Sequence, residues 1–373
     1  MRVLVVGAGI AGLAAARGLA GAGHDVVVLE RAAGPRLGGG AITLWSNGTG
    51  IVRDLGVDLD KTGQRLDALA VRTAKGRRVA DVDLTALGAR LGTEARVVPR
   101  GALITLLADG LPDVRFGERV ADVTLDGHAV RARTDDGTVH EADLLVGADG
   151  VRSRVRAAVL GDGPAPPTGV VGWQGLTPAP FDPGATTTLV VGRTGDCGYM
   201  GAGDGLVQWF FDGPPPPSGQ RPLDTLRARY AGWAEPVPTL LASLTDADVE
   251  VHRQYRHAVP RRWGARRCVL LGDAAHAMPP AAAQGANQAL EDVTALLDCL
   301  ATADDPRYVA DAYSARRGVK ARRASAVASG ALAVSGPRTL LQAEPLMRGA
   351  AALPGRLATV ALERLLRALS DRF

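Results

Sequence analysis

The sequence predicts an α/β fold with three parts: a unit built on a parallel sheet, an inserted and mostly antiparallel β-sheet, and C-terminal helices. Three observations support this prediction. Residues 1–30 read as strand, glycine turn, helix and strand. Residues 161–257 change to proline-rich breaks and short β runs, and residues 301–373 carry two long helical patterns.

The first thirty residues follow the order of elements that is typical of a Rossmann-like nucleotide-binding unit. Arg2 to Val6 is a short apolar run of the kind that makes a buried strand, and Gly7 to Gly12 reads GAGIAG. A helical pattern follows, and a second apolar run, Val26 to Leu29, ends at Glu30. This context, more than the GxGxxG pattern alone, predicts a dinucleotide site.

Each residue of this motif has a physical role. Gly7 permits the tight turn, Gly9 lets a pyrophosphate approach the backbone, and Gly12 lets the helix pack closely on the strands. The helix N-terminus offers N–H groups to the phosphates, and Glu30 stands where an acid would bind ribose hydroxyls. The motif does not distinguish FAD from NAD(P), although Glu30 would repel the 2′-phosphate of NADP.

The composition is that of a globular enzyme. The 373 residues are 46% hydrophobic and 22% charged, and the basic residues behind the net charge of +4 are spread along the chain. A nucleic-acid surface would need a clustered basic face, so no nucleic-acid partner is expected. The six histidines and three cysteines lack metal-ligand spacing, so no metal is expected either.

Neither a signal peptide nor a membrane span is expected from the sequence. Met1 leads directly into a core strand, which argues against a signal peptide. No uncharged apolar stretch reaches about 18 residues, so no integral membrane segment is expected. The cysteines are odd in number and widely spaced, which indicates a reducing cytoplasm.

A glycine-rich loop and a short strand follow Glu30. Gly38 to Gly40 suit a loop against a flat ligand, or else a flexible surface loop. Ala41 to Trp45 reads as a short strand. Asn47-Gly48 predicts a turn before a helix near Thr49 to Leu55.

Arg100 occupies an unusual position for a basic residue. Leu66 to Leu84 alternates like two antiparallel strands, and Arg100 then stands in the first turn of a helix over Gly101 to Gly110. An arginine there opposes the helix dipole. Either it meets an anionic or polar ligand group, or it is a solvated arginine.

A second glycine turn comes after a further buried strand. Val114 to Thr138 is rich in strand patterns, with Asp135-Asp136-Gly137 as a hairpin turn. Leu144 to Val146 then leads into Asp149-Gly150, with Ser153 and Arg156 at helical spacing. Asp149 could equally be only a turn or helix-cap residue.

The middle segment has the texture of an inserted antiparallel sheet that covers a pocket. Its β runs are Gly169 to Leu176, Thr187 to Val191 and Leu206 to Asp212, with helical segments near Leu223 to Trp233 and Thr239 to Ser243. The inward face could include Trp173, Tyr199, Gln208 and Phe210, or these residues could equally be plain sheet core. The candidate pocket residues are Trp45, Gln174, Tyr199, Gln208, Phe210 and Pro280.

A third strand, acid, loop and helix follow. Cys268 to Leu271 reads as a buried strand that ends in Gly272-Asp273, and a helix begins near Gly285. Long helices are expected from Asp305 to Ser329 and from Ala351 to Leu369. The last could contact a membrane or a partner, or pack on its own core.

These three motifs together resemble the FAD-dependent aromatic hydroxylases, the single-component class A flavoprotein monooxygenases with a p-hydroxybenzoate hydroxylase-like fold. GAGIAG with Glu30 is the first motif, DGVRSRVR is similar to the family's Asp-Gly-x-x-Ser-x-x-Arg, and GDAAH…P…QGANQALED is the third. The resemblance covers nearly the whole chain. In texture, the middle sheet is most similar to urate hydroxylase and zeaxanthin epoxidase-like members.

The resemblance implies roles for individual residues. Glu30 would bind the adenosine ribose of FAD, Arg100 and Asp273 would lie near the ribityl or pyrophosphate, and the loop from Pro280 would meet the isoalloxazine edge. His276 could act as a catalytic base, but a structural role is favoured because it lies in the flavin loop. The implied cofactor-binding residues are Gly7, Gly9, Ile10, Ala11, Gly12, Glu30, Arg31, Gly40, Ala41, Arg100, Asp149, Gly150, Gly272, Asp273, Pro280, Gln284, Gly285, Ala286 and Asn287.

The resemblance also divides the chain. Residues 1–70 would form the FAD-binding βαβ part, 71–97 a β insertion on the substrate side, and 98–160 the FAD-binding continuation with the Asp-Gly motif. Residues 161–262 would form the substrate-binding β-sheet domain. Residues 263–300 would hold the Gly-Asp motif and its helix, and 301–373 the C-terminal helices.

The activity implied is that of an NAD(P)H- and O₂-dependent monooxygenase acting through a C4a-hydroperoxyflavin. No second GxGxxG exists for NAD(P)H, which fits a class in which the nicotinamide visits transiently. Ala283 departs from the family pattern, because the family usually has glycine there. Two rival hypotheses are a flavin reductase or dehydrogenase on the same fold, and a flavin-bound scaffold without turnover.

The expected substrate is a small to medium, electron-rich aromatic or polyketide-like compound that is hydroxylated or epoxidised. The middle segment shows no arginine cluster that would demand a carboxylate on the substrate, although Arg193 stays open. The chain's many arginines and few lysines suggest secondary metabolism. A monomer or homodimer in the cytoplasm is expected.

Overall fold

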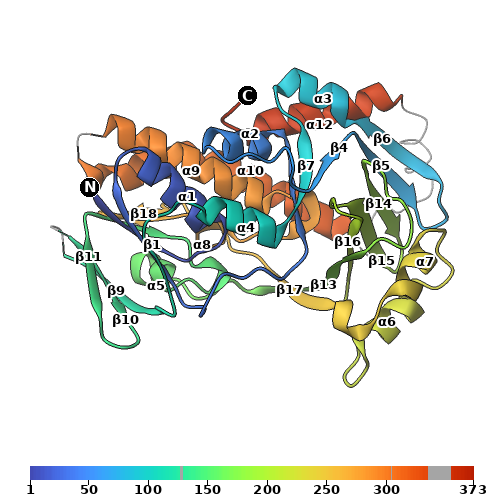
Figure 1. Cartoon of the computed structure of the whole chain (residues 1–373), viewed down its shortest axis with the longest axis horizontal. Coiled ribbons are helices and arrows are strands. Elements are labelled where there is room, and N and C mark those ends of the chain that lie inside the picture. Colours follow the sequence, from blue (N-terminus) through green and yellow to red (C-terminus); the bar gives the residue numbers. More distant parts are fainter. Residues whose placement is uncertain (127–128, 304, 335–353) are drawn as a thin grey trace.

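The chain forms two β-sheet regions with helices running between them (Figure 1). In this computed structural model the described residues are 1–126, 129–303, 305–334 and 354–373. One region holds a six-stranded, mainly parallel sheet, and the other holds a seven-stranded sheet. The long helices α9 (Gly285–Thr302) and α10 (Val309–Val334) extend from the first region toward the second.

The six-stranded sheet gathers segments from three distant parts of the sequence. All its neighbouring strands are parallel except β18 and β19. Because parallel strands end at the same edge, the turns after β1, β2, β12 and β19 gather there. The strand order is β18 (Gly264–Ala265), β19 (Cys268–Leu270), β12 (Leu144–Gly147), β1 (Arg2–Val6), β2 (Asp25–Glu30) and β8 (Val114–Phe116).

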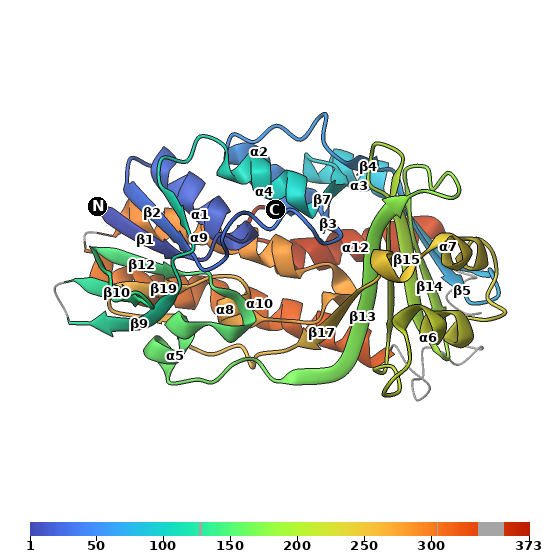
Figure 2. The same cartoon turned by 60° about the horizontal axis from the view of Figure 1, so that its bottom comes forward.

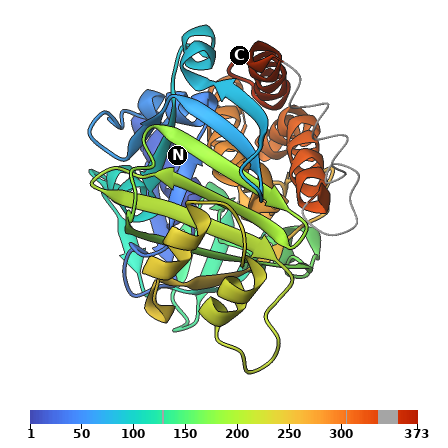
Figure 3. The same cartoon turned by 90° about the vertical axis from the view of Figure 1, so that its right-hand side faces the viewer.

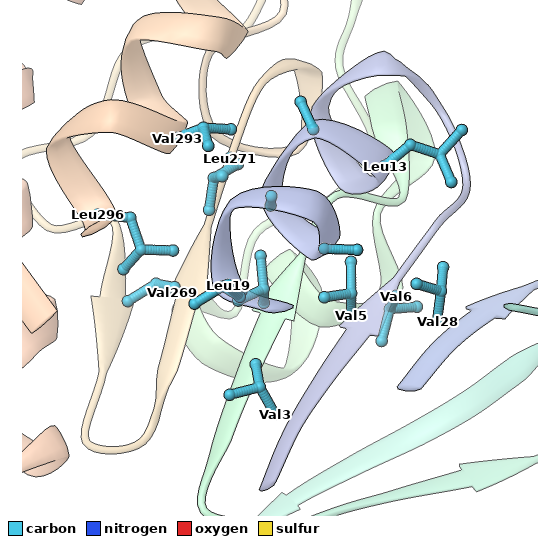
Figure 4. Close-up of a cluster of buried hydrophobic side chains, with 14 of the residues drawn as sticks. Val3, Val5, Val6, Leu13, Leu19, Val28, Val269, Leu271, Val293 and Leu296 are labelled. Atoms are coloured by element: carbon cyan, nitrogen blue, oxygen red, sulfur yellow. The ribbon is translucent and has the colours of Figure 1, made fainter. Parts of the chain in front are cut away.

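A core of aliphatic side chains fixes this sheet against helix α1 (Ile10–Gly21) and α9 (Figure 4). Val3 and Val5 of β1, Leu13 of α1, and Val293 and Leu296 of α9 are each no more than 1% exposed. Fully burying such a side chain contributes about 1.5–3 kcal/mol. The apolar runs of the sequence therefore hold the strand ends, and the turns that follow them, in one place.

Two small antiparallel sheets and several helices complete this region. The expected hairpin at 135–137 is confirmed, because β10 and β11 pair antiparallel on either side of it. One small sheet is β11 (Val139–Ala142), β10 (Val130–Thr134) and β9 (Val120–Leu125), and the other is β3 (Ala41–Leu44), β7 (Ala95–Pro99) and β4 (Gln64–Leu66). The helices are α2 (Ser46–Asp54), α3 (Leu84–Leu91), α4 (Arg100–Ala108), α5 (Arg154–Leu160) and α8 (Asp273–His276).

The expected Asn47-Gly48 turn is wrong, because both residues lie inside α2. Asn47 is fully buried and donates from Nδ2 to Glu291 Oε1 over 2.9 Å. A Cβ on Gly48 would stand 2.1 Å from Asn287 Oδ1, so α2 and α9 meet closely at this glycine. Packing against a distant helix has overridden the local turn preference of the dipeptide.

The seven-stranded sheet contains the expected β runs of the middle segment and two strands from earlier in the chain. The pair β5 and β6, expected over Leu66 to Leu84, is antiparallel, and only β14 and β5 pair in parallel. The fold class is thereby confirmed. The order is β17 (Glu250–Tyr255), β13 (Pro167–Pro178), β16 (Leu206–Gly213), β15 (Gly195–Gly201), β14 (Thr186–Gly192), β5 (Ala68–Thr73) and β6 (Arg78–Asp83).

The two faces of this sheet have different cover. Helices α6 (Pro222–Arg229) and α7 (Val237–Ser243) lie over the outer face, as Figure 3 shows. Trp173, Trp209 and Phe211 pack there with Tyr230. Met200 on the opposite face belongs to a cluster with side chains of α3, β7 and α12 (Gly355–Leu369), which lies on that side of the sheet (Figure 2).

The C-terminal helices are present. The helix expected from Asp305 to Ser329 corresponds to α10, and α12 begins directly after Pro354, while residues 351–353 lie outside the described part. Leu366 and Leu369 of α12 are 1% exposed, so the helix packs on the protein's own core. Among the described residues, no helix is both long and apolar enough to cross a lipid bilayer.

Asp212 is a buried carboxyl on β16. It lies opposite Asp196 of β15 in the strand register, and Gln254 Nε2 donates to its Oδ1 over 2.8 Å. Burial, aided by the negative charge of Asp196 and opposed by the Gln254 hydrogen bond, raises the pKa of Asp212 from 3.8 to about 7. The folded protein therefore holds a proton that the unfolded chain has already released.

The raised pKa predicts a pH-dependent loss of stability. The stability that the folded protein gains by keeping the Asp212 proton is fully present below pH 3.8 and is lost as the pH rises to about 7. Relative to the Asp212→Asn variant, the wild-type free energy of unfolding should fall across this window by up to about 1.4 kcal/mol per pH unit. Urea unfolding of both proteins at several pH values measures the difference, and parallel curves would contradict the prediction.

Candidate functional site

A cleft of about 820 Å³ opens at the carboxyl edge of the parallel sheet. Its walls come from the turn after β1, the end of β2, the start of α4, the turn after β12 and the start of α8. The strand order of the sheet brings these segments together. Of the residues expected to bind the cofactor, the cleft is lined by Gly7, Gly9, Glu30, Arg31, Arg100, Asp149, Gly150 and Asp273.

The glycine turn has three glycines with three different surroundings. Gly7 has a φ of +106°, and a Cβ on it would stand 2.4 Å from the carbonyl oxygen of Ala148. A Cβ on Gly12 would stand 1.8 Å from the Gly7 carbonyl oxygen. A Cβ on Gly9 would meet no atom within 4 Å. Gly7 and Gly12 are therefore required by the protein itself, whereas the space beside Gly9 is open to a ligand.

Glu30 is held in a fixed orientation at the end of β2. Its Oε2 accepts a hydrogen bond from Ala8 N over 2.8 Å, and its Oε1 accepts one from Ala32 N over 2.9 Å. Each carboxylate oxygen keeps a free lone pair for another donor. The carboxylate is thus attached to the glycine turn and oriented before any ligand binds.

Asp149 accepts hydrogen bonds from the first amides of helix α5 and lines the cleft at the same time. Its Oδ1 accepts from the Ser153 hydroxyl over 2.5 Å, and its Oδ2 accepts from Arg154 N over 2.6 Å. Burial raises the pKa of Asp149, and these hydrogen bonds oppose the rise. Ser153 is the N-cap residue of α5, and Asp149 adds a second acceptor for the amides of its first turn. The adjacent Gly150 has a φ of +80°.

Arg156 connects the second motif to the third. Its side chain is 2% exposed and donates to the carbonyl oxygens of Ala274 and Ala275 over 3.0 and 2.8 Å. Its guanidinium also pairs with Asp162 at 2.6 Å. The last arginine of the DGVRSRVR motif therefore holds the backbone of α8.

Arg100 and Asp273 are two opposite charges on the wall of the cleft. Burial, followed by the charge of Arg36, lowers the pKa of Arg100, while Asp273 and Glu250 oppose this. Within the described residues the Arg100 Nε atom is buried without a hydrogen-bond partner. Enclosure by the cleft walls raises the pKa of Asp273, against the influence of His276 and Arg100. An unmet donor beside a polar cleft indicates a ligand acceptor at this point.

The remaining expected cofactor residues lie outside the cleft lining. Ile10, Ala11 and Gly12 form the first turn of α1, and a Cβ on Gly272 would stand 3.0 Å from the Ala11 Cβ. Gln284 precedes α9, and Gly285 and Ala286 are its first residues. The first turn of α1 is therefore packed against the turn after β19, which joins the first and third motifs.

Asn287 joins the third motif to the segment after Gly40. Its Nδ2 donates to the Thr43 and Ala283 carbonyl oxygens over 3.0 and 2.7 Å, and its Oδ1 accepts from Trp45 N over 3.0 Å. These contacts are made inside the protein. Asn287 therefore fixes the loop before α9 against β3.

Pro280 opens a short 3-10 helix, Pro280–Ala282, and is exposed. The indole Nε1 of Trp45 donates to the Ala282 carbonyl oxygen at the end of this helix over 3.3 Å. On the other side, Gln208 Oε1 accepts from Ala41 N, and a Cβ on Gly40 would stand 2.4 Å from the same oxygen. Gly40 is thus a close contact between the loop and the inserted sheet.

The candidate pocket residues of the inserted sheet divide between its two faces. Gln174 pairs with Phe210, and Gln208 lies two residues from Phe210, so all three point to one face. Tyr199 pairs with Trp209 and therefore points to the other face, where its ring packs edge-on against Phe181 at 5.5 Å. The structure brings Gln174, Gln208 and Phe210 together on the side of Ala41 and leaves Tyr199 apart from them.

The cleft also contains residues that were not expected. Arg152 and Arg154 lie inside the DGVRSRVR motif, whose spacing pointed only to Asp149, Gly150, Ser153 and Arg156. Arg36, Arg119 and Tyr255 come from segments without a recognisable pattern. Their position depends on how the loops fold over the sheet edge.

His276 has the structural role that was favoured over a catalytic one. It is 0% exposed, and its Nε2 lies 2.6 Å from Asp292 Oδ2. Among the described residues, no group of three or more histidine, cysteine or acidic side chains is arranged to hold a metal ion.

Ala283 keeps the backbone conformation that glycine adopts most easily. Its φ is +50° and its ψ is 33°, in the left-handed region. A non-glycine residue there costs roughly 1–2 kcal/mol. The chain tolerates this cost because the Ala283 carbonyl oxygen accepts from Asn287 Nδ2 and its amide donates to the Pro280 carbonyl oxygen.

Replacing Ala283 with glycine should therefore stabilise the protein. We expect the free energy of unfolding to rise by about 1 kcal/mol, because the left-handed strain is removed. The matched control is Ala282→Gly in the preceding 3-10 helix, which should destabilise by about 0.5–1 kcal/mol. Urea unfolding checks both, and equal shifts for the two variants would show that Ala283 is not strained.

The comparisons with known proteins place the chain in one family over most of its length. Residues 1–328 match the family model described as FAD binding domain. The FAD-dependent urate hydroxylase of Klebsiella oxytoca is 34% identical over 334 residues, which cover 85% of this chain and 86% of that protein. The 3-amino-4-hydroxybenzoate 2-monooxygenase of Streptomyces cremeus is 38% identical over 318 residues, or 80% and 78% of the two chains.

A solved structure agrees with these sequence matches. The crystal structure of Klebsiella pneumoniae HpxO complexed with FAD and uric acid superposes with a TM-score of 0.91. Its sequence identity is 28%, and the superposition covers 99% of this chain and 97% of that one. The likeness therefore includes the inserted sheet and the C-terminal helices.

The residues of the cleft fit FAD. The open space beside Gly9 admits a pyrophosphate, Glu30 presents oriented carboxylate oxygens, and the unmet Nε of Arg100 can donate to an oxygen. These three groups line one cleft together with Asp149 and Asp273. The chain therefore belongs to the FAD-dependent aromatic hydroxylases, the class A flavoprotein monooxygenases, and is an oxidoreductase that inserts one oxygen atom.

Proposed function

We propose that this protein uses NAD(P)H and O₂ to hydroxylate or epoxidise a small to medium, electron-rich aromatic or polyketide-like compound. The observation that carries the proposal is the meeting of Gly9, Glu30, Arg100, Asp149 and Asp273 in one cleft. Named relatives with monooxygenase activity, over most of their length, support the oxygen-insertion part. The rival reductase and scaffold hypotheses lack such relatives among those reported above.

We infer the following division of roles within the cleft. The glycine turn and the N-terminus of α1 bind the pyrophosphate, and Glu30 binds the adenosine ribose. Arg100 and Asp273 contact the ribityl or pyrophosphate part, with Asp149 and Gly150 beside it. The first residues of α9 direct N–H groups toward the isoalloxazine edge and would stabilise negative charge there. When bound, FAD supplies the redox and oxygen-activating chemistry, and the protein supplies position and a dry surrounding.

The substrate would lie between the flavin edge and the inserted sheet. On this side, Gln174 offers an amide, and Phe210 and Trp45 offer aromatic surfaces. The side-chain oxygen of Gln208 already accepts a hydrogen bond from Ala41 N. None of these side chains carries a charge. This supports an uncharged, flat substrate, oriented by stacking and by a few hydrogen bonds.

The nicotinamide co-substrate is proposed to visit the cleft only transiently. The sequence has one GxGxxG unit, and the proposed FAD site uses it.

Cys197, Cys268 and Cys299 are buried free thiols, which supports a reducing cytoplasm as the location. We propose a monomer or homodimer as the working form.

The proposal is tested by product analysis with isotopically labelled O₂. Purified protein is supplied with FAD, NADH or NADPH, and a panel of phenols, purines and polyketides. One labelled oxygen atom in a product supports a monooxygenase, and stopped-flow spectra should show a transient that differs from oxidised and reduced flavin only when O₂ is present. Flavin reduction without label in any product would favour a reductase, and a colourless protein that does not take up FAD would refute the cofactor assignment.

A further inference from the structure

The short helix α8 carries Asp273 at its first position and has little structure of its own. It spans Asp273–His276, and its internal backbone bonds are those from Ala275 N and His276 N to the Gly272 carbonyl oxygen, each 2.9 Å long. Gly272 before it has a φ of +55°. A single helical turn does not hold itself together in water. The placement of the turn that carries Asp273 therefore depends on contacts from outside it.

Asp292 of α9 provides such contacts from behind the turn. Its Oδ2 accepts a hydrogen bond from Gly272 N over 2.9 Å and lies 2.6 Å from His276 Nε2. One carboxylate oxygen therefore binds the residue before Asp273 and the last residue of the same helix. Asp292 itself is 0% exposed, so it makes no contact with the cleft.

Arg317 of α10 fixes Asp292 in turn. Its Nε donates to Asp292 Oδ1 over 2.8 Å, and one of its terminal nitrogens donates to Gln288 Oε1 over 2.7 Å. Arg317 is also 0% exposed. Burial alone would raise the pKa of Asp292, but His276 and Arg317 lower it, so Asp292 is a carboxylate.

Stability alone does not explain this arrangement. A buried ion pair is often no more stabilising than apolar residues of the same volume, because both ions lose their hydration. What the pair does provide is a fixed point with a defined direction: both oxygens of Asp292 are occupied, and both contacts on Oδ2 go to one turn. That turn carries Asp273, whose carboxylate faces the cleft.

We propose that Asp292, held by Arg317, is a positioning residue that sets the Asp273 carboxylate for its contact with FAD. Asp292 acts through Gly272 N–H and His276 and never touches the cofactor. The inference rests on the proposed function, in which Asp273 is a FAD contact. His276 is then a link in the positioning contact.

A double-mutant cycle on FAD affinity tests the proposal. Asp273→Asn and Asp292→Asn are prepared singly and together, and FAD is titrated into each apoprotein while flavin fluorescence is followed. We expect each single variant to bind FAD about tenfold more weakly, and the double variant to bind no more weakly than the weaker single variant. A merely structural role for Asp292 would instead give additive losses. Far-UV circular dichroism defines the temperature at which every variant is folded.

The matched control is Asp298→Asn. Asp298 lies on α9 like Asp292, and its ion pair with Arg316 lies on the surface, so FAD affinity should stay within about twofold of wild type. If Asp292→Asn does not fold, the same cycle is run with His276→Leu, which removes only one of the three donors to Asp292. The expected non-additivity with Asp273→Asn is the same.

The possible outcomes separate the two proposals. Unchanged FAD affinity in Asp273→Asn would overturn the assigned cofactor contact, and with it the positioning role. Weaker binding in Asp273→Asn together with additive or absent effects of Asp292→Asn would overturn the positioning role only. Non-additive losses of the expected size support both.

Discussion

Replacing Gly12 with alanine is expected to disrupt the glycine turn and abolish FAD binding. The new Cβ would stand 1.8 Å from the carbonyl oxygen of Gly7, and that oxygen is backbone that cannot turn aside. Relieving the contact requires α1 to move away from β1, within a core that is already close-packed. We expect a loss of about 3 kcal/mol in the free energy of unfolding. Thermal unfolding and FAD titration measure the two effects.

Two other glycines of the same segment make the test specific. Gly21→Ala, at the exposed end of α1, meets no atom within 4 Å and should change stability by no more than about 1 kcal/mol. Gly9→Ala also meets no atom, so the apoprotein should stay stable while FAD affinity falls at least about tenfold, because the methyl group enters the space of the pyrophosphate. If Gly9→Ala binds FAD as tightly as wild type, the pyrophosphate does not lie at this turn and the assignment is wrong.

The second large effect is expected from Arg156→Met. The change removes a buried guanidinium that donates to the carbonyl oxygens of Ala274 and Ala275, and it leaves both acceptors without that donor. Losing charge-assisted hydrogen bonds in the interior costs about 3 kcal/mol. Because these carbonyls belong to α8, FAD affinity should fall as well. Urea unfolding and flavin titration of the apoprotein check the two parts.

Two matched arginine variants accompany this prediction. Arg154→Met, two residues earlier on the same helix, changes an exposed side chain and should leave the free energy of unfolding within about 0.5 kcal/mol. Arg156→Lys keeps the charge but offers fewer donors, so its stability should lie between wild type and Arg156→Met. If Arg156→Met and Arg154→Met are equally stable, the hydrogen bonds from Arg156 to the carbonyl oxygens of α8 do not contribute to stability.

Much of the fold follows from local patterns. The apolar run Arg2 to Val6 and the glycines after it predict a strand, a turn and a helix, since these residues constrain the backbone directly. The Asp-Gly and Gly-Asp turns were found in the same way, and the cleft gathers residues of all three. Alternation along β16 likewise predicts that Gln208 and Phe210 share a face.

Other features could not be predicted because they depend on contacts between distant segments. Alternation does not say which face of a sheet meets the cofactor, so Tyr199 was grouped with Phe210 although it packs against Phe181 on the other side. Asn47 sits in a helix because Glu291, far along the chain, accepts its hydrogen bond. Arg317 has no motif around it, and its role follows only from the packing of α10 beside α9.

The order of residues is enough to predict that three glycine- and acid-bearing turns follow buried strands, and these turns predict the fold class and the family. Contacts between distant segments were needed to show that Asp149 binds the start of α5 while lining the cleft, that Arg156 reaches across to α8, and that Asp292 and Arg317 support the turn of Asp273. The physical reason is that short apolar and glycine patterns act on the local backbone. A buried polar side chain, in contrast, must find its partner wherever packing brings one.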